Sequence, residues 1–385
     1  MARQPTTSPS TWRASRPVAR LLYVGLMTGT SIDGVDAAIV DISTGTPPKL
    51  IHGVTLPIPA QLRQELHELC SPGANEIDRL GRADVWLGTL LGDCVLTLLE
   101  RVGLAPSAIA AIGSHGQTIR HRPGAEHGFT LQIGDPTRIA ERTGITVVAD
   151  VRRRDMAARG QGAPLAPAFH AELFRSQLTD RVVVNIGGIA NITFLPADPG
   201  APVLGYDTGP GNALMDAWVR RHLGHDYDAE GGWADLGAVS SDLLADMQQE
   251  PYFATAPPTS TGRELFNSRW IDNFNLGAIS PVDVQRTLLE LTAQTIAAEI
   301  QLVAPGGAEV ILCGGGRRNL ALRRCLDLTL GRPTQTTDDY NWDGDHLEAG
   351  LCAWIAAMTL TGRAANLPSV TGAAGPRLLG AIFPA

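Results

Sequence analysis

The chain has 385 residues and a formal net charge of −8, with 44% hydrophobic and 18% charged residues. This length is enough for two domains, and the composition is that of a folded globular protein, which excludes a mainly disordered chain. The net negative charge does not favour binding of nucleic acid, which is itself negatively charged. The longest apolar run, residues 351–360, is too short to span a bilayer. Neither nucleic acid nor a membrane is therefore an expected partner.

The N-terminal stretch and the cysteines bear on location. Residues 1–20 are rich in Arg, Ser, Thr and Pro and have no apolar centre, so we expect a disordered tail and not a secretory signal. The five cysteines are scattered and form no C-x-x-C pair. This pattern indicates reduced thiols in a cytoplasm and argues against both a disulfide framework and a structural zinc site.

The lysine content limits how the chain could bind a nucleotide. Lys49 is the only lysine, and no G-x-x-x-x-G-K-[ST] loop is present. If the protein handles ATP, the charge of the phosphates must be met by backbone amides, arginine or a metal ion.

The first predicted element is a β-hairpin, with apolar runs at residues 22–26 and 37–42 on either side of a turn. The turn holds a glycine that allows close backbone approach, two hydroxyl residues, and carboxylates for magnesium or its waters: Gly29, Thr30, Ser31, Asp33 and Asp36. Such a turn is typical of the first phosphate loop of actin-like and sugar-kinase-like ATPases. An ordinary hairpin with a polar turn is the alternative.

The rest of the first half alternates helices and strands. Residues 61–69 and 76–103 have helical periodicity, and 110–112 and 145–149 are predicted strands. We expect a polar loop at residues 113–121. Strands that end in polar or glycine-rich loops build sites at the carboxyl edge of an open α/β sheet.

The second half repeats the opening pattern. Residues 182–195 predict a second hairpin with Gly187 and Gly188 at its turn. Two such hairpins, each opening its own α/β segment, favour a duplicated ATPase clamp around a nucleotide. A third glycine cluster follows the strand at 309–313, where Gly314 and Gly315 could support an adenosine or form only a tight strand-to-helix connection.

A carboxylate lies beside glycines further along this half. We expect a strand to end at Tyr206, Asp207 to lie at its tip, and a helix to begin near Asn212, a good N-cap residue. Asp207 could then reach a substrate as a general base, or it could only brace the turn.

Several short motifs match one known family in order. They are GTSIDGVD at 29–36, SHGQT at 114–118, GQGAP at 160–164, NIGG at 185–188, DTGPGN at 207–212, STGRE at 260–264, CGGG at 313–316 and TGA at 371–373. From about residue 21 to the C-terminus the chain resembles the anhydro-N-acetylmuramic acid kinases of bacterial cell-wall recycling.

The resemblance implies an α/β, two-domain actin-like ATPase fold with ribonuclease H-like duplicated halves, here residues 21–180 and 181–385. It also implies a cytoplasmic homodimer that uses ATP and Mg²⁺. The substrate would be 1,6-anhydro-N-acetylmuramic acid, which is hydrolysed at its internal bridge and phosphorylated on O6, giving N-acetylmuramic acid 6-phosphate and ADP in peptidoglycan recycling.

The resemblance assigns roles residue by residue. It gives ATP binding to Gly29, Thr30, Ser31, Ile32, Asp33, Gly34, Val35 and Asp36. The second hairpin and the third glycine cluster add Gly187, Gly188, Gly314 and Gly315 as expected ATP contacts. Catalysis falls on Asp207, and magnesium on Asp33 and Asp36, through water or directly. The sugar falls on Arg120, Ser260, Gly262, Arg263 and Glu348.

Three positions depart from the family pattern, and other functions compete. Val151 replaces Phe, Arg159 replaces Gly, and Thr259 replaces a Lys, which removes a cation near the expected sugar or phosphate site. A conventional sugar kinase is the closest alternative. A non-catalytic, nucleotide-driven ATPase and a glycosidase using Asp207 with Glu348 are the others.

Overall fold

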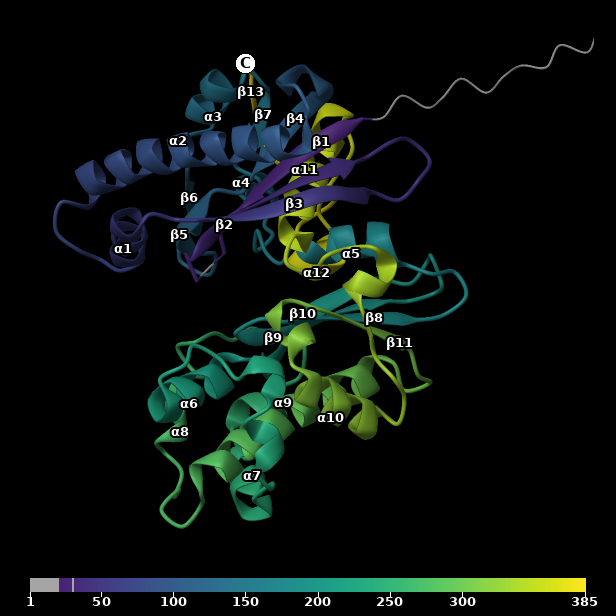
Figure 1. Cartoon of the computed structure of the whole chain (residues 1–385). Coiled ribbons are helices and arrows are strands. Elements are labelled where there is room, and N and C mark those ends of the chain that lie inside the picture. Colours follow the sequence, from purple (N-terminus) through teal and green to yellow (C-terminus); the bar gives the residue numbers. More distant parts are fainter. Residues whose placement is uncertain (1–20, 30) are drawn as a thin grey trace, which may run out of the picture.

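The computed structural model describes residues 21–29 and 31–385, arranged as two lobes, each built on one β-sheet (Figure 1). The predicted tail at residues 1–20 and Thr30 lie outside the described residues. Within the described part of the chain, no helix has the length and apolar character needed to cross a membrane.

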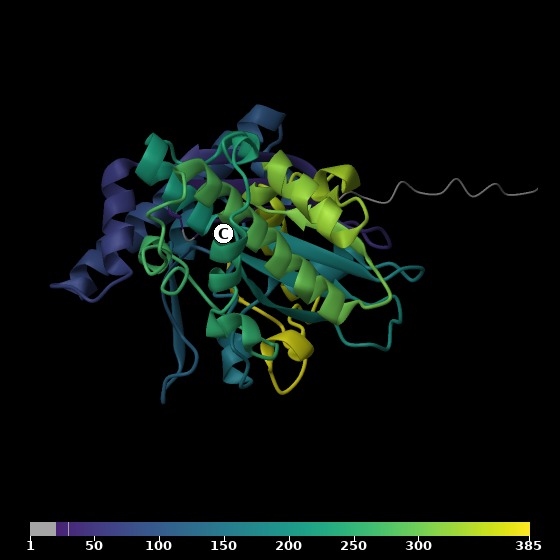
Figure 2. The same cartoon turned by 90° about the horizontal axis from the view of Figure 1, so that it is seen from below.

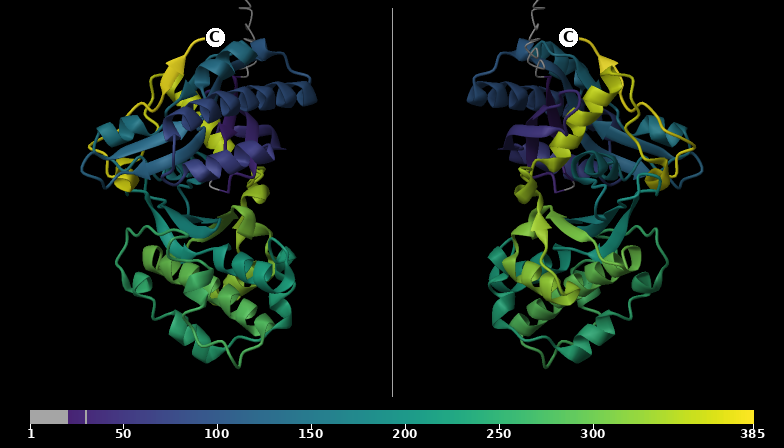
Figure 3. Two further views of the ribbon diagram at one scale, coloured as in Figure 1. Left: turned by 90° about the vertical axis from the view of Figure 1, so that its left-hand side faces the viewer. Right: turned by 90° about the vertical axis from the view of Figure 1, so that its right-hand side faces the viewer.

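The first lobe contains a six-stranded sheet with the strand order β13-β7-β4-β1-β2-β3. Strands β1 to β3 are antiparallel neighbours, whereas β4 is parallel to β1 and β7 is parallel to β4. The strands are β1 (Leu22–Met27), β2 (Gly34–Asp41), β3 (Lys49–Pro57), β4 (Ile109–Ser114), β7 (Val147–Ala149) and β13 (Ala381–Phe383). The long helix of this lobe lies across one face of the sheet, with two shorter ones beside it (Figures 1 and 3). These helices are α1 (Ala60–Leu69), α2 (Glu76–Val102) and α3 (Pro136–Thr143).

The second lobe repeats this topology in a five-stranded sheet with the order β10-β9-β8-β11-β12. Its first three strands are again antiparallel, and the last two again run parallel to the first. The strands are β8 (Arg181–Ile186), β9 (Ile189–Leu195), β10 (Leu204–Pro210), β11 (Glu309–Cys313) and β12 (Gln335–Thr336). The repeated strand order agrees with the predicted duplicated halves of an actin-like fold.

Helices cover the outer face of the second sheet, as the view from below shows (Figure 2). They are α6 (Ala213–Leu223), α7 (Ser241–Met247), α8 (Ser268–Ile271), α9 (Pro281–Val303) and α10 (Leu320–Leu330). A large apolar core lies between α9, α6, α10 and the sheet, and includes Leu288, Leu291, Val184 and Leu312. Besides six short 3-10 helices, the remaining elements of the described residues are β5 (Gln117–Arg122), β6 (Phe129–Ile133), α4 (Arg153–Ala157), α5 (Ala166–Phe174), α11 (Leu347–Leu360) and α12 (Pro368–Thr371).

The end of the chain returns to the first lobe. Helix α11 packs on β1, β4 and β2, and β13 pairs antiparallel with β7. Helix α11 approaches so closely that a Cβ on Gly25 would lie 1.7 Å from the Ala349 carbonyl oxygen. Helix α11 and β13 therefore belong with the first sheet although they follow the second sheet in the chain, whereas α12 contacts β10 of the second sheet. The hydrophobic pattern of the sequence cannot show which sheet α11 covers. The helix is apolar on all sides and lies buried between two layers, so it has no polar face that would orient it.

A predicted loop and a predicted strand end both differ from the structure. Most of residues 113–121 belongs to the end of β4 and to β5, which forms a separate two-stranded sheet with β6. Strand β10 does not end at Tyr206 but continues to Pro210, so Asp207 lies within the strand. The pairing with β9 shifts register between Asp207 and Gly209, which is a local irregularity at the residue of interest.

Candidate functional site

A cleft of about 1080 Å³ lies between the lobes. Its walls bring together the first turn, the second hairpin, the third glycine cluster, the segment after Ser260 and the start of α11. Predicted site residues that line it are Gly29, Ser31, Asp33, Gly34, Asp36, Gly187, Gly188, Gly262, Arg263, Gly314, Gly315 and Glu348. Residues far apart in the sequence thus meet at one place, as a clamp requires.

The first turn lies between β1 and β2 and presents polar groups to the cleft. The Ile32 amide donates to the Gly29 carbonyl at 3.2 Å, which closes the turn, and the Ser31 hydroxyl donates to Asp33 Oδ1 at 2.9 Å. Ser31 and Asp33 are exposed, whereas Ile32 and Val35 are buried and anchor the turn in the lobe's core. Ile32 and Val35 therefore support the loop, and its polar side chains remain accessible to a ligand.

The second hairpin rests on the N-terminus of α6. The Gly187 carbonyl accepts the Asn212 amide at 2.8 Å, and the Gly188 carbonyl accepts the amides of Gly211 and Ala213 at 2.9 and 3.0 Å. Asn212 stands at the N-cap as expected, but its side chain donates to the Ile186 carbonyl and does not cap the helix. The carbonyls of this turn are thus satisfied within the lobe and hold the backbone in place.

The third glycine cluster packs against the second hairpin. Gly314 has φ +73°, and a Cβ there would lie 2.3 Å from Asn185 Oδ1, so only glycine fits. Gly315 is exposed in the cleft, and the N-cap residue of α10, Asn319, accepts the Leu322 amide at 3.0 Å. The cluster therefore forms a flat, fixed surface beside the second hairpin.

Asp207 is half-buried in β10, and its carboxylate is held from outside the sheet. The Thr261 amide donates to Asp207 Oδ2 at 3.0 Å. Thr261 lines the cleft, and Asp207, which is hydrogen-bonded to its amide, is not among the lining residues. Burial raises the pKa of Asp207, nearby Glu264 adds to the rise, and hydrogen bonds from Thr261 and Ser260 oppose it. A carboxylate with a raised pKa is a better proton acceptor than a free aspartate.

Two further carboxylates in the cleft influence each other. Glu348, at the start of α11, is accessible to solvent within the cleft, but the surrounding walls displace water and raise its pKa. The negative charge of Asp36 adds to this rise and Arg152 opposes it. Burial also raises the pKa of Asp36, while the Thr55 hydroxyl, which donates to Asp36 Oδ1 at 2.6 Å, opposes the rise.

The predicted sugar residues divide into two groups. Gly262 and Arg263 line the cleft, with the Arg263 guanidinium directly against Gly188. Ser260 is not among the lining residues, and its hydroxyl acts to lower the pKa of Asp207. Arg120 is not among the residues that line the cleft. Its guanidinium donates to the Leu69 carbonyl and forms an ion pair with Glu76 at 2.7 Å, which ties β5 to α1 and α2.

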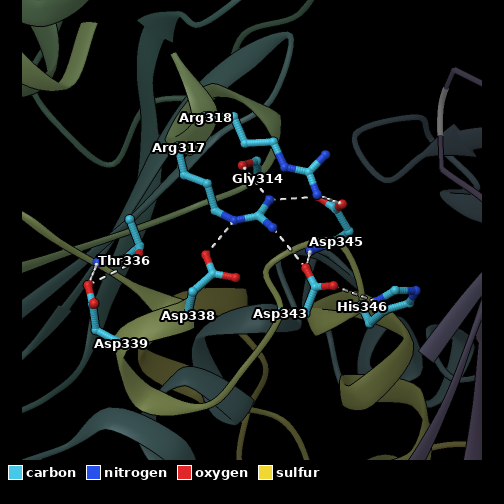
Figure 4. Close-up of polar contacts among 9 residues, drawn as sticks. All are labelled: Gly314, Arg317, Arg318, Thr336, Asp338, Asp339, Asp343, Asp345 and His346. Atoms are coloured by element: carbon cyan, nitrogen blue, oxygen red, sulfur yellow. Dashed lines mark hydrogen bonds and ion pairs between the residues drawn. The ribbon is translucent and has the colours of Figure 1, made fainter. Parts of the chain in front are cut away.

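An arginine and its carboxylates join the glycine cluster to the segment that crosses between the lobes (Figure 4). Arg317 is 4% exposed and donates from Nε to Asp338 and from its two terminal nitrogens to Asp343 and Asp345, at 2.8, 2.8 and 2.6 Å. Its Nη1 also donates to the Gly314 carbonyl at 3.2 Å. Asp345 lines the cleft three residues before Glu348. The arginine therefore fixes the path of the chain into α11.

Sequence reasoning missed several cleft residues. Phe169 and His170 of α5, Thr55 of β3 and Asp345 all line the cleft. Burial lowers the pKa of His170 to about 4, so it is neutral near pH 7. None of these residues lies in a glycine-rich turn, so no local pattern identifies them. Only the carboxylate run after residue 337 could have drawn attention to Asp345.

The carboxylates fit a magnesium ion held mainly through water. Among the described residues, no group of three His, Cys, Asp or Glu side chains could hold a metal by itself. Magnesium bound to a nucleotide keeps several waters and needs only one or two protein carboxylates. Asp33 and Asp36, which line the cleft at the first turn, meet that requirement.

Comparison with known proteins identifies the family of the chain. A family described as anhydro-N-acetylmuramic acid kinase matches residues 21–385. The chain is 50% identical to the anhydro-N-acetylmuramic acid kinase of Coxiella burnetii (strain RSA 493 / Nine Mile phase I), covering 94% of this chain and 97% of that protein. It is 51% identical to that of Xanthomonas campestris pv. campestris (strain 8004), with the same coverage.

A solved structure, the activator of the 2-hydroxyisocaproyl-CoA dehydratase from Clostridium difficile with bound ADPNP, is 15% identical with a TM-score of 0.43. It covers 89% of this chain and 97% of that one. From the family match and the two full-length relatives, the chain belongs to the anhydro-N-acetylmuramic acid kinase family.

Proposed function

We propose that the cleft binds ATP with Mg²⁺ and 1,6-anhydro-N-acetylmuramic acid together. The enzyme opens the anhydro bridge with water and phosphorylates O6, giving N-acetylmuramic acid 6-phosphate and ADP. The observation that carries this proposal is the convergence of both hairpin turns, the third glycine cluster and Glu348 on one cleft, with Asp207 hydrogen-bonded to the lining residue Thr261. Family membership suggests the substrate, and the residues that line the cleft support the proposed roles.

The nucleotide would lie along the glycine turns. Backbone at Gly29 and Gly34 would approach the phosphates from one lobe, and Gly187 and Gly188 from the other, with the adenosine on Gly314 and Gly315. Arg263, against Gly188, supplies positive charge where no lysine is available. A magnesium ion, when bound through Asp33 and Asp36, offsets the charge of the phosphates.

Asp207 would act as the general base. It accepts a proton from the water that attacks C1, the C1–O6 bond breaks, and O6 accepts the γ-phosphoryl group as ADP leaves. The raised pKa of Asp207 favours this proton transfer. Because residues of both lobes line the cleft, we propose that the lobes close over the bound ligands. Small-angle scattering with both ligands should then give a smaller radius of gyration than the free enzyme.

The decisive test follows the oxygen atoms. In water labelled with heavy oxygen, the sugar product should carry the label at C1 and none on the phosphate, because water opens the acetal and O6 receives the phosphoryl group. Label on the phosphate, or equal turnover of N-acetylmuramic acid as acceptor, would instead indicate ATP hydrolysis or a conventional sugar kinase.

Assembly and location extend the proposal. We propose a homodimer, which sedimentation of the purified enzyme would detect at about twice the mass of the chain, 40.8 kDa. All five cysteines have free thiols, four of them buried, which is consistent with activity in a reducing cytoplasm.

A further inference from the structure

The backbone at Asp207 is held by side chains outside the sheet. The Asp207 carbonyl accepts the Tyr252 hydroxyl at 2.7 Å and the Thr259 hydroxyl at 2.6 Å. The Asp207 amide in turn donates to the Thr259 carbonyl at 3.0 Å. Asp207 is thus flanked by the segment 259–261 at its amide, its carbonyl and its carboxylate, at the place where β10 loses register with β9.

Tyr252 is itself rigidly placed. Its ring makes edge contacts with Phe253 and Phe266, with centroids 5.8 and 5.6 Å apart, and Phe266 is completely buried. Burial raises the pKa of Tyr252 to about 12, so the hydroxyl stays protonated. It can therefore donate to the Asp207 carbonyl across the range of pH in which an enzyme works.

We propose that Tyr252 and Thr259 are positioning residues for Asp207, holding the irregular part of β10 so that the carboxylate faces the sugar. This inference rests on the proposed role of Asp207 as the base. It also gives a function to Thr259, where the family commonly has a lysine: the hydroxyl fixes the base, so this position contributes alignment in place of charge.

The physical reason lies in the geometry of the bulge. At a register shift a strand loses ladder hydrogen bonds, and its backbone is free to rotate unless other groups hold it. A rotation at Asp207 moves the carboxylate, and a displacement of about 1 Å at a reacting group can lower a rate by about 100-fold. Two hydroxyl donors on one carbonyl prevent that rotation without touching the substrate.

The test uses substitutions that remove one oxygen each. Thr259→Val and Tyr252→Phe keep side-chain size, and Thr259→Ser restores the donor. Thr255→Val is the matched control, because Thr255 lines the same small cavity beside Asp207 but its hydroxyl donates to the Pro251 carbonyl at 3.3 Å. The measurements are kcat with both substrates, the dissociation constant of ATP with Mg²⁺, and the midpoint of thermal unfolding.

We expect kcat to fall about tenfold in each single variant and about 100-fold in the double variant, with the dissociation constant of ATP unchanged within about twofold. Thr259→Ser and Thr255→Val should retain wild-type kcat. The proposal is overturned if the double variant keeps its kcat, if Thr259→Ser is as slow as Thr259→Val, or if ATP affinity falls in parallel. Asp207→Asn is measured alongside to separate failure of the positioning proposal from failure of the proposed base. Full turnover in that variant would mean that Asp207 is not the base.

Discussion

The two glycine turns that face each other across the cleft are built differently. The first turn exposes Ser31 and Asp33, whose side chains hydrogen-bond to each other. The second turn uses the carbonyls of Gly187 and Gly188 to accept amides at the start of α6, and Gly314 is pressed against Asn185. The comparison shows that one lobe offers adaptable polar groups, whereas the other offers a rigid platform that also carries Asp207.

The largest effect should come from Asp207, the proposed base, which lies in the second lobe. Asp207→Asn keeps the size of the side chain and can still accept the Thr261 amide, but it cannot take a proton from water. We expect kcat to fall by about two to four orders of magnitude, equivalent to about 3–5 kcal/mol of transition-state stabilisation. The dissociation constant of ATP should stay unchanged in calorimetric titration. A variant with normal turnover would reduce Asp207 to a brace for the neighbouring loop.

The connection between the lobes should show the next largest effect, on stability. Arg317→Ala leaves three carboxylates gathered around an empty position, and breaking a buried ion pair on one side costs about 3–5 kcal/mol. Because these carboxylates are 30–50% exposed, we expect the lower end, about 3 kcal/mol, in urea unfolding.

The neighbouring arginine is the control for that experiment. Arg318 also pairs with Asp345, but its side chain is 65% exposed, so Arg318→Ala should cost about 1 kcal/mol or less. Equal losses in both variants would mean that burial of Arg317 contributes nothing to the link between the lobes.

A pair of glycine substitutions tests the comparison directly. Gly314→Val places a side chain at φ +73° against Asn185, so we expect loss of stability by about 1–3 kcal/mol before any ligand is added. Gly29→Val has space, since the nearest atom to its Cβ, Ser31 Oγ, is 3.9 Å away. It should unfold like the wild type but lose the rise in thermal midpoint that ATP with Mg²⁺ produces. The reverse pattern would assign rigidity to the first lobe.

Local sequence patterns predicted the two hairpins and the helices α1, α2, α6 and α10, because periodicity and glycine turns depend on neighbouring residues, but they did not identify the long helix α9. On the same basis they predicted a shared site for Gly187 and Gly314, and both residues line the cleft. They could not place α11 on the first sheet or Arg120 outside the cleft, since both depend on packing between distant segments. The extension of β10 past Asp207 was missed because glycine and proline usually end a strand, whereas here they occupy an irregular edge strand.

The smallest expected effect is a shift in the pH dependence of kcat, caused by a change in the pKa of Asp207 in the second lobe. The folded pKa of Asp207 is raised, so the protonated form is favoured by folding: its contribution to stability is present at low pH and is lost as pH rises through the folded pKa. Activity follows the opposite course, because the base works only when ionised.

Ser260 hydrogen-bonds the carboxylate and lowers its pKa. Ser260→Ala should therefore move the acid limb of the kcat profile to higher pH and leave the plateau within about threefold of the wild type. Thr261, whose amide also donates to Asp207, keeps that bond when its side chain is changed, so Thr261→Ala is the matched control and should leave the limb in place. An acid limb that ignores Ser260 would mean that another group, with Glu348 the first to examine because its pKa is also raised, controls the ionisation that turnover needs.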